Sequence, residues 1–180
     1  MSYFQDASPE SLGISSGGIL RFLDRMEEKN IELHSFMVVR HGKCAAKGWW
    51  KPYGPQYLHP VYSFSKSLTA TAIGFAEQEG ILSLDEKLVD CFAEDLPETV
   101  SDNLAKATVK DLLTMCLGQE KAELMGAQRP VYEEEDWVKM SLAFPFVYEP
   151  GTKFVYNNVG PYLAAVSYTH LRAHETELHL

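Results

Sequence analysis

The sequence has few cysteines, no excess of basic residues and no long apolar run, and each of these absences excludes a class of protein. Its three cysteines, Cys44, Cys91 and Cys116, lie far apart and form no Cys-x-x-Cys pair. An odd number of scattered cysteines is typical of buried or idle thiols in a reducing compartment, and it argues against a disulfide framework or a zinc site. We therefore expect three free thiols.

Basic residues are outnumbered by acidic ones. Lysine and arginine together number 16 against 25 aspartate and glutamate residues, and the formal net charge is −9. Nucleic acids and anionic membranes both attract basic surfaces. The charge balance therefore argues against either as a partner.

No uninterrupted apolar run approaches the roughly 18–20 residues that cross a bilayer as a helix. Residues 1–13 contain neither a basic segment nor an apolar segment of the kind found in secretory signals. From these two absences we expect a cytoplasmic protein without a membrane span.

The residues that are present predict an α+β fold. Of the 180 residues 46% are hydrophobic and 23% are charged, which is typical of one globular domain or part of a larger one. Apolar residues at helical spacing predict a helix over residues 15–29, and residues 35–40 and 44–50 flank a turn as a β-hairpin does. Further helices are predicted over residues 63–80, after a capping box at residues 108–111, and over residues 137–142. This order of elements contains one hairpin, and the other strands that would complete its sheet are not identified in the sequence.

The helix predicted at residue 63 begins with a serine followed three residues later by a lysine, Ser63 and Lys66. Such a pair is common by chance, and a helix-capping serine with a solvated lysine is the simpler interpretation. On a helix, however, this spacing places both side chains on one face. A hydroxyl needs a neighbouring base to become a nucleophile, and a partly desolvated lysine can serve. The residues that follow are apolar nearly all round, which predicts a helix buried in a core.

Two downstream triplets could complete a site around Ser63. Ser101-Asp102-Asn103 spells a β-lactamase motif, but it lies in a polar stretch and we interpret it as a turn. The second triplet, Tyr156-Asn157-Asn158, follows a Pro-Gly turn. A tyrosine can pass a proton to or from a serine, and an asparagine can orient a lysine and a substrate amide.

Together these stretches resemble the serine β-lactamase-related hydrolases, the superfamily of class C β-lactamases, DD-peptidases and their esterase and amide-hydrolase relatives. The resemblance rests on residues 62–70, 79–85, 108–115 and 150–158, which occur in the family's order, and it covers about residues 10–165. It implies a β-lactamase/DD-peptidase-like fold, an antiparallel sheet packed with helices plus a helical subdomain.

The resemblance also implies acyl transfer to a serine. Ser63 would attack the carbonyl of a small-molecule ester, amide or peptide, and water would release the acyl group. Lys66 would be the general-base partner of the serine, Tyr156 the proton shuttle and Asn158 the orienting group. No metal and no organic cofactor is implied.

The sequence departs from the family's pattern after Tyr156. The family's third element, a Lys-Thr-Gly or His-x-Gly on a strand beside the site, does not follow. A back-translation of residues 166–176 instead resembles a transposase-type sequencing adapter read in frame. We therefore expect residues 1–165 to be the N-terminal part of such a hydrolase domain, incomplete at the C-terminus, and residues 166–180 to be a non-native tail.

Two other groups of residues invite a functional interpretation. His174 and His179 nearly form a zinc-protease motif, but they are five residues apart rather than four and do not share a helix face. We assign no metal to them or to His170. The aromatic residues before Ser63 either line a substrate cleft or cover the end of the hairpin; they are Trp49, Trp50, Tyr53, Tyr57 and Tyr62.

Two functions remain open from the sequence. The first is a serine hydrolase that forms an acyl-enzyme. The second is a catalytically incompetent fragment or a non-enzymatic β-lactamase-like binding protein, because half of the oxyanion hole and part of the sheet are missing from the 180 residues.

Overall fold

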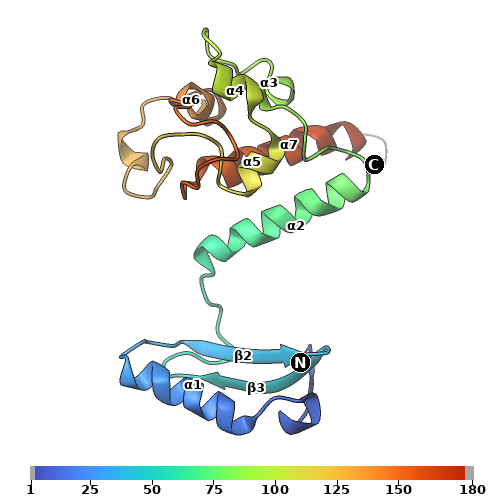
Figure 1. The fold of residues 1–180 in the computed structure, drawn as a ribbon, viewed down its shortest axis with the longest axis vertical. Coiled ribbons are helices and arrows are strands. Elements are labelled where there is room, and N and C mark those ends of the chain that lie inside the picture. Colours follow the sequence, from blue (N-terminus) through green and yellow to red (C-terminus); the bar gives the residue numbers. More distant parts are fainter. Residues whose placement is uncertain (1–2, 177–180) are drawn as a thin grey trace. The chain divides into compact units, whose positions relative to one another are not determined.

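The computed structural model describes residues 3–176, with side chains up to residue 169, and the chain forms two compact units (Figure 1). The first unit comprises Met1–Pro60 and the second comprises Val61–Leu180. Each unit has its own secondary structure and is described separately below.

The first unit is a small sheet with one helix across it (Figure 1). The strands lie in the order β1-β3-β2, with β1 parallel to β3 and β2 antiparallel to it. The predicted helix and hairpin are both present, and Ser15 caps the helix by accepting a hydrogen bond from the backbone N–H of Gly18. The elements of this unit are β1 (Gln5–Asp6), α1 (Ser16–Glu28), β2 (Ser35–Arg40) and β3 (Lys43–Trp49).

The second unit is helical and contains the main hydrophobic core of the described residues. The core is built from the inner faces of its helices and the loops between them, and its fully buried side chains include Ile73, Leu88, Leu112 and Leu163. The helices are α2 (Ser65–Gln78), α3 (Leu88–Cys91), α4 (Asp102–Lys106), α5 (Val109–Leu113), α6 (Trp137–Ala143) and α7 (Val159–Thr176).

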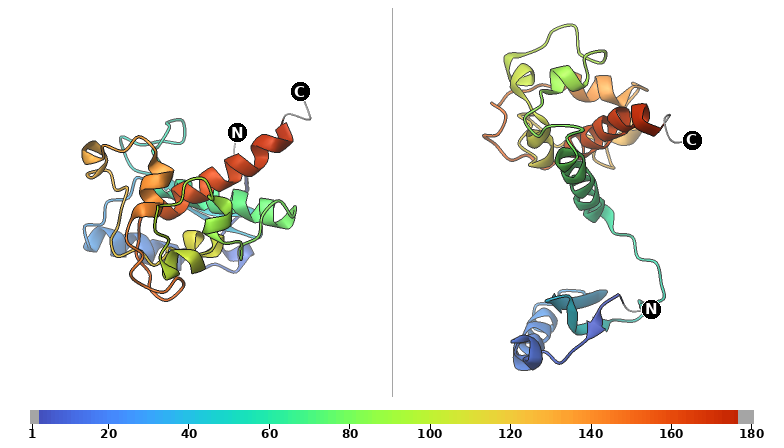
Figure 2. Two further views of the ribbon diagram at one scale, coloured as in Figure 1. Left: turned by 90° about the horizontal axis from the view of Figure 1, so that it is seen from above. Right: turned by 90° about the vertical axis from the view of Figure 1, so that its right-hand side faces the viewer.

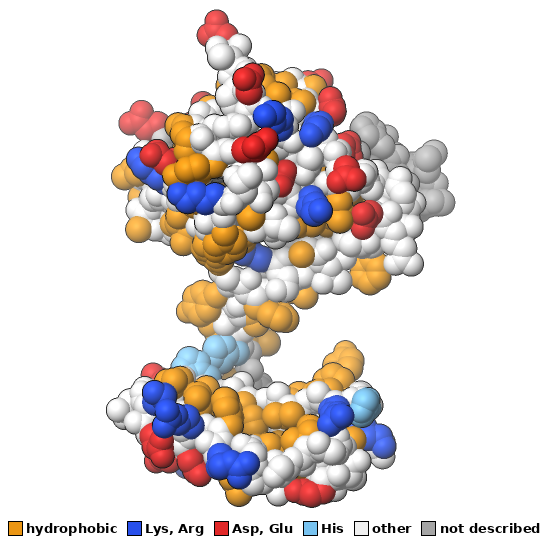
Figure 3. All heavy atoms as spheres, viewed as in Figure 1, with side chains coloured by type: hydrophobic (Ala, Val, Ile, Leu, Met, Phe, Trp, Pro, Cys, Tyr) orange, Lys and Arg blue, Asp and Glu red, His pale blue; other side chains and the backbone are white. Residues whose placement is uncertain are grey.

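Helix α2 carries Lys66 and ends as the sequence predicts, with Gly80 at φ 73° directly after its last turn. It lies beside α7 (Figures 1 and 2). The expectation that it is buried all round is wrong. Only Ile73 and Ala76 are fully buried, whereas Leu68 and Phe75 are 60% and 58% exposed, and hydrophobic side chains are visible along its surface (Figure 3). The reason is that α2 packs against the helical core along one side.

One expectation about the polar connections is also corrected. Ser101 does not lie in a simple turn: its hydroxyl accepts a hydrogen bond from the N–H of Leu104 and caps α4. The Asn103 amide donates to the carbonyl of Phe146. The segment before α6 turns inward at Gln119 and Leu124, which are 1% and 2% exposed. Because polar residues surround them in the sequence, no local pattern indicates that Gln119 and Leu124 are buried.

The capping box predicted at residues 108–111 is present. The Asp111 carboxylate accepts a hydrogen bond from the N–H of Thr108 at 2.9 Å, and α5 begins at the next residue. Within residues 3–176, no helix has the length and apolar character needed to cross a membrane.

Gly160, in the first turn of α7, permits a close approach to α5. A Cβ at this position would lie 2.5 Å from the carbonyl oxygen of Leu112, which is backbone and cannot move aside easily. We expect Gly160→Ala to lower the free energy of unfolding by about 1–3 kcal/mol, the usual cost of overpacking a core. Denaturant unfolding followed by circular dichroism measures it.

Gly74→Ala in α2 is the matched control, because a Cβ there meets no atom within 4 Å. This second substitution is expected to leave the stability unchanged or to raise it by up to about 1 kcal/mol through helix propensity. Equal effects of the two substitutions would contradict the close-packing interpretation.

Candidate active site

Ser63 lies at the point where the chain enters α2. It is the middle residue of a 3₁₀ turn, Tyr62–Phe64, that leads directly into the helix. Tyr62, the residue before it, has φ 44°, in a region that residues other than glycine rarely adopt. The turn leaves the Ser63 side chain exposed at the N-terminal end of α2, where the helix dipole is positive. The site therefore has an accessible hydroxyl in a favourable electrostatic position.

Lys66 reaches Ser63 across the first turn of the helix. Its Nζ donates a hydrogen bond to Ser63 Oγ at 3.1 Å. Ser63 is exposed and Lys66 is half-buried. The three-residue spacing brings the two side chains together, as predicted.

Tyr156 approaches the same oxygen from a distant part of the sequence. Its phenol donates a hydrogen bond to Ser63 Oγ at 2.6 Å, and Lys66 Nζ lies 5.2 Å from the centre of its ring. Backbone hydrogen bonds hold the segment before Tyr156 against the loop that follows α5: the N–H of Val155 donates to the carbonyl of Met115, and the N–H of Gly151 to that of Cys116. The structure thus brings together three of the four predicted residues.

The contacts around Tyr156 favour its deprotonated form. The ionised phenol can accept a hydrogen bond from the Ser63 hydroxyl, and this has the largest effect; the interaction with Lys66 comes next, and together they lower the pKa of Tyr156 below that of an ordinary phenol. A phenolate becomes accessible at lower pH than in an isolated tyrosine. Tyr156 can therefore accept a proton as well as donate one.

We expect a spectroscopic titration to show this shift. The tyrosinate absorbance of the wild type minus that of Tyr156→Phe isolates this residue among the 9 tyrosines, and its midpoint should lie below the ordinary tyrosine value. Lys66→Met should raise the midpoint, because it removes the cation that stabilises the phenolate. Lys153→Met serves as the control, because Lys153 Nζ lies 3.8 Å from the ring centre of a different tyrosine, Tyr148. This substitution should not move the midpoint of Tyr156. A midpoint insensitive to Lys66→Met would contradict the arrangement.

Asn158 makes its described contacts with a different part of the unit. Its side-chain amide nitrogen donates to the carbonyl of Leu124 at 2.9 Å, and its backbone N–H donates to the carbonyl of Glu123 at 3.1 Å. These bonds anchor the end of the Tyr-x-Asn triplet to the loop before α6. Its part as an orienting group stays a prediction.

Sequence reasoning overlooked the structural residues that support the triplet. Asn157 is 1% exposed, and its side-chain oxygen accepts a hydrogen bond from the N–H of Gly160, which caps α7. The pattern Asn-x-x-Gly before an apolar run was a usable capping signal. No local pattern reveals Glu123 and Leu124, because their contacts with Asn158 span distant parts of the chain.

Cys91 is not poised as a second nucleophile. The three cysteines are free, and burial, with the nearby Glu86 carboxylate, raises the pKa of Cys91 to about 12, which keeps it a protonated thiol. Among the described residues no group of three or more His, Cys, Asp or Glu side chains could hold a metal ion. The side chains of His170, His174 and His179 lie outside the described residues.

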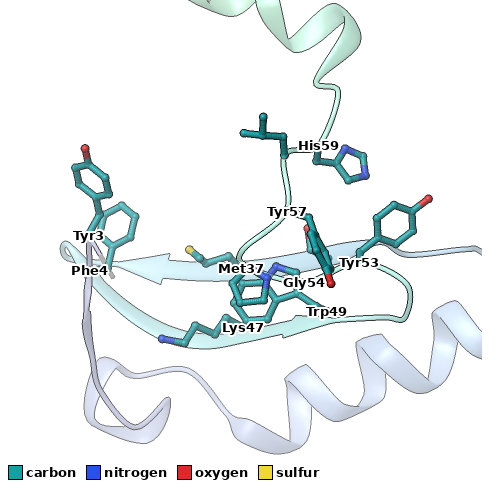
Figure 4. A pocket seen from close by; sticks show the side chains of 12 residues that line it. Tyr3, Phe4, Met37, Lys47, Trp49, Tyr53, Gly54, Tyr57 and His59 are labelled. Carbon is teal, nitrogen blue, oxygen red and sulfur yellow. The ribbon is translucent and has the colours of Figure 1, made fainter. Parts of the chain in front are cut away.

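Three of the predicted aromatic residues line a pocket in the first unit (Figure 4). Trp49 lies at the end of β3, and Tyr53 and Tyr57 come from the loop after it. Tyr53 stacks on His34 with ring centres 3.9 Å apart. The lining of this pocket includes none of the four predicted catalytic residues.

The sequence profile of one family, described as Beta-lactamase, matches residues 21–166. This range includes Ser63, Lys66, Tyr156 and Asn158, and it covers most of the 180 residues. A comparison with curated proteins found no match.

Several solved structures share the fold. The octameric penicillin-binding protein homologue from Pyrococcus abyssi is 20% identical, with a TM-score of 0.64, and the match covers 88% of this chain and 40% of that one. A class C beta-lactamase is 21% identical with a TM-score of 0.62, covering 83% and 42%. A family VIII carboxylesterase is 20% identical with a TM-score of 0.55, covering 87% and 44%. The chain thus spans less than half the length of these structures.

Proposed function

Because the chain belongs to the beta-lactamase family, we propose that it carries the acylating residues of a serine hydrolase that cleaves small-molecule esters, amides or peptides. The observation that carries the proposal is the convergence of Lys66 and Tyr156 on Ser63 Oγ, at 3.1 Å and 2.6 Å. A serine oxygen within hydrogen-bond reach of a titratable group that can act as its base is the mark of an activated nucleophile.

The proposed reaction begins with attack of Ser63 Oγ on the substrate carbonyl carbon. The serine proton passes to Lys66 or Tyr156, whichever is in its basic form, and a tetrahedral intermediate forms. Its collapse breaks the bond to the leaving group, which takes up a proton from the same pair. A water molecule then attacks the acyl carbon, the bond from that carbon to Ser63 Oγ breaks, the acyl group leaves as a carboxylic acid and Ser63 Oγ regains its proton. Asn158 is proposed to orient the lysine and the substrate amide.

The substrate class follows from this chemistry and from the similar proteins. A carboxylesterase and a class C beta-lactamase share the fold, so esters and cyclic amides are the first compounds to test. The acidic net charge of −9 favours neither nucleic acid nor anionic membranes as partners. No cofactor is required by the proposed mechanism, and a cytoplasmic location stays a prediction.

Labelling with a fluorophosphonate probe and with a labelled penicillin tests the proposal. Each probe should form a covalent adduct of one molecule per chain, and peptide mass spectrometry should place it on Ser63. No adduct on Ser63, either in this chain or in a longer product of the same gene, would reject the hydrolase.

The alternative is a catalytically incompetent fragment or a binding protein with a β-lactamase-like fold. The observation that favours it is length, because the chain covers 40–44% of the three solved structures named above. Losing one oxyanion donor lowers turnover by about 10²–10³ in a well-studied protease. Reversible penicillin binding without an adduct would support this alternative.

A further inference from the structure

The loop of residues 122–132, before α6, is closed by its own side chains. The Gln128 amide donates to the carbonyl of Ala122 at 3.0 Å and to the Glu123 carboxylate at 3.3 Å, and its oxygen accepts from the N–H of Met125 at 2.9 Å. These bonds tie the middle of the loop to its beginning. The loop therefore has a defined shape although it contains only a single 3₁₀ turn.

Tyr132 lies at the centre of these contacts. Its phenol donates to the Glu123 carboxylate at 2.9 Å and accepts from the backbone N–H of Leu124 at 3.2 Å. Burial of the ring, with the adjacent carboxylate, raises the pKa of Tyr132, so the phenol keeps its proton and remains a donor. One hydroxyl thus fixes both the side chain of Glu123 and the backbone of Leu124.

Leu124 needs this support because its backbone is unusual. Its φ of 56° lies in the left-handed region, which costs a residue with a bulky side chain free energy. Its side chain is only 2% exposed and belongs to the core. The hydrogen bond from Tyr132 and the burial of the side chain together hold this conformation.

The result is a pair of consecutive carbonyls that face Asn158. The carbonyl of Glu123 accepts from the backbone N–H of Asn158 and that of Leu124 accepts from its side-chain amide, at 3.1 Å and 2.9 Å. Asn158 follows Tyr156 by two residues and precedes α7. The two carbonyls therefore hold the end of the segment that places the Tyr156 hydroxyl on Ser63.

We propose that Tyr132 is a positioning residue for the reaction at Ser63, acting through Glu123 and Leu124 on the Tyr156-to-Asn158 segment. Tyr132 touches neither the serine nor the lysine, and its effect is the placement of Tyr156 and Asn158. The proposal rests on the proposed function for its consequence in catalysis. The placement itself can be measured without catalysis.

The test compares Tyr132→Phe with Tyr148→Phe, which removes a hydroxyl from a ring that lies outside the loop and contacts Lys153. Tyr132→Phe should speed hydrogen exchange of the peptide containing the N–H of Asn158 by about tenfold, and it should move the titration midpoint of Tyr156 toward the ordinary tyrosine value. If wild-type Ser63 is labelled, the labelling rate should fall by roughly 10- to 10²-fold, as expected for a misplaced catalytic group. Tyr148→Phe should change none of these.

Two further variants separate positioning from loss of stability. Val138→Ala truncates a buried side chain of α6 and should lower the melting temperature without moving the Tyr156 midpoint. Glu123→Gln keeps an acceptor oxygen for Tyr132 and should preserve most of the placement, whereas Glu123→Ala should lose it. Wild-type values in Tyr132→Phe for exchange, midpoint and labelling would overturn the proposal. Absence of labelling in the wild type would count against acylation by this chain and leave the exchange and titration results to decide the positioning.

Discussion

Replacing Ser63 by alanine is expected to abolish covalent labelling by a fluorophosphonate and to lower ester or amide turnover by at least about 10³-fold. The physical reason is that Lys66 and Tyr156 both place their polar atoms on Ser63 Oγ, so the substitution removes the atom at which their chemistry converges. In-gel fluorescence and intact-protein mass measure the adduct, and stopped assays with an activated ester measure turnover.

Ser65→Ala is the matched control for this experiment. Ser65 is an exposed serine at the start of α2, two residues beyond Ser63, and it belongs to no described contact with Lys66 or Tyr156. Its substitution should leave labelling intact. Labelling that survives in Ser63→Ala, or disappears in Ser65→Ala, would show that the nucleophile is misassigned.

Replacing Lys66 by alanine is expected to lower the acylation rate by at least about 10²-fold, the scale of lost acid–base help. The loss has two sources. Lys66 Nζ lies 3.1 Å from the serine oxygen, where it can exchange a proton, and its charge lowers the pKa of Tyr156. The rate of fluorophosphonate adduct formation over a range of pH measures the effect.

Lys66→Arg separates the two sources, because arginine keeps the positive charge and does not lose its proton in proteins. If proton transfer by Lys66 dominates, Lys66→Arg should be nearly as slow as Lys66→Ala. If its charge acts chiefly through Tyr156, Lys66→Arg should retain most of the rate. Lys110→Ala, at an exposed lysine of α5, is the control and should react as the wild type does. Near-normal acylation in Lys66→Ala would remove the lysine from the mechanism.

The pH dependence of labelling should follow the same pair. Because the pKa of Tyr156 is lowered, its basic form appears at lower pH than for a free phenol, and labelling should increase as the pH rises through that midpoint. In Lys66→Ala, the rise should move to higher pH. Tyr156→Phe should lose the dependence on that midpoint.

Local patterns in the sequence were sufficient for several elements because the interactions that form them are local. The hairpin is two short strands on either side of a turn at Gly42, and the capping box at Thr108 closes between residues three apart. The Ser63–Lys66 contact belongs to the same class, since a helical turn alone brings the two side chains together. The expectation of full burial for α2 failed because apolar composition shows what a helix can bury, whereas its neighbours decide what it does bury.

The sequence by itself determined the family, the α+β order of the elements and the serine and lysine at the start of α2. Only the tertiary structure decided that Tyr156 reaches Ser63 while Asn158 is anchored to the carbonyls of Glu123 and Leu124. The reason is that Tyr156 and Ser63 are 93 residues apart, and contacts of that range are set by the packing of α7 and its preceding segment against α2 and α5. Local spacing carries no information about such contacts.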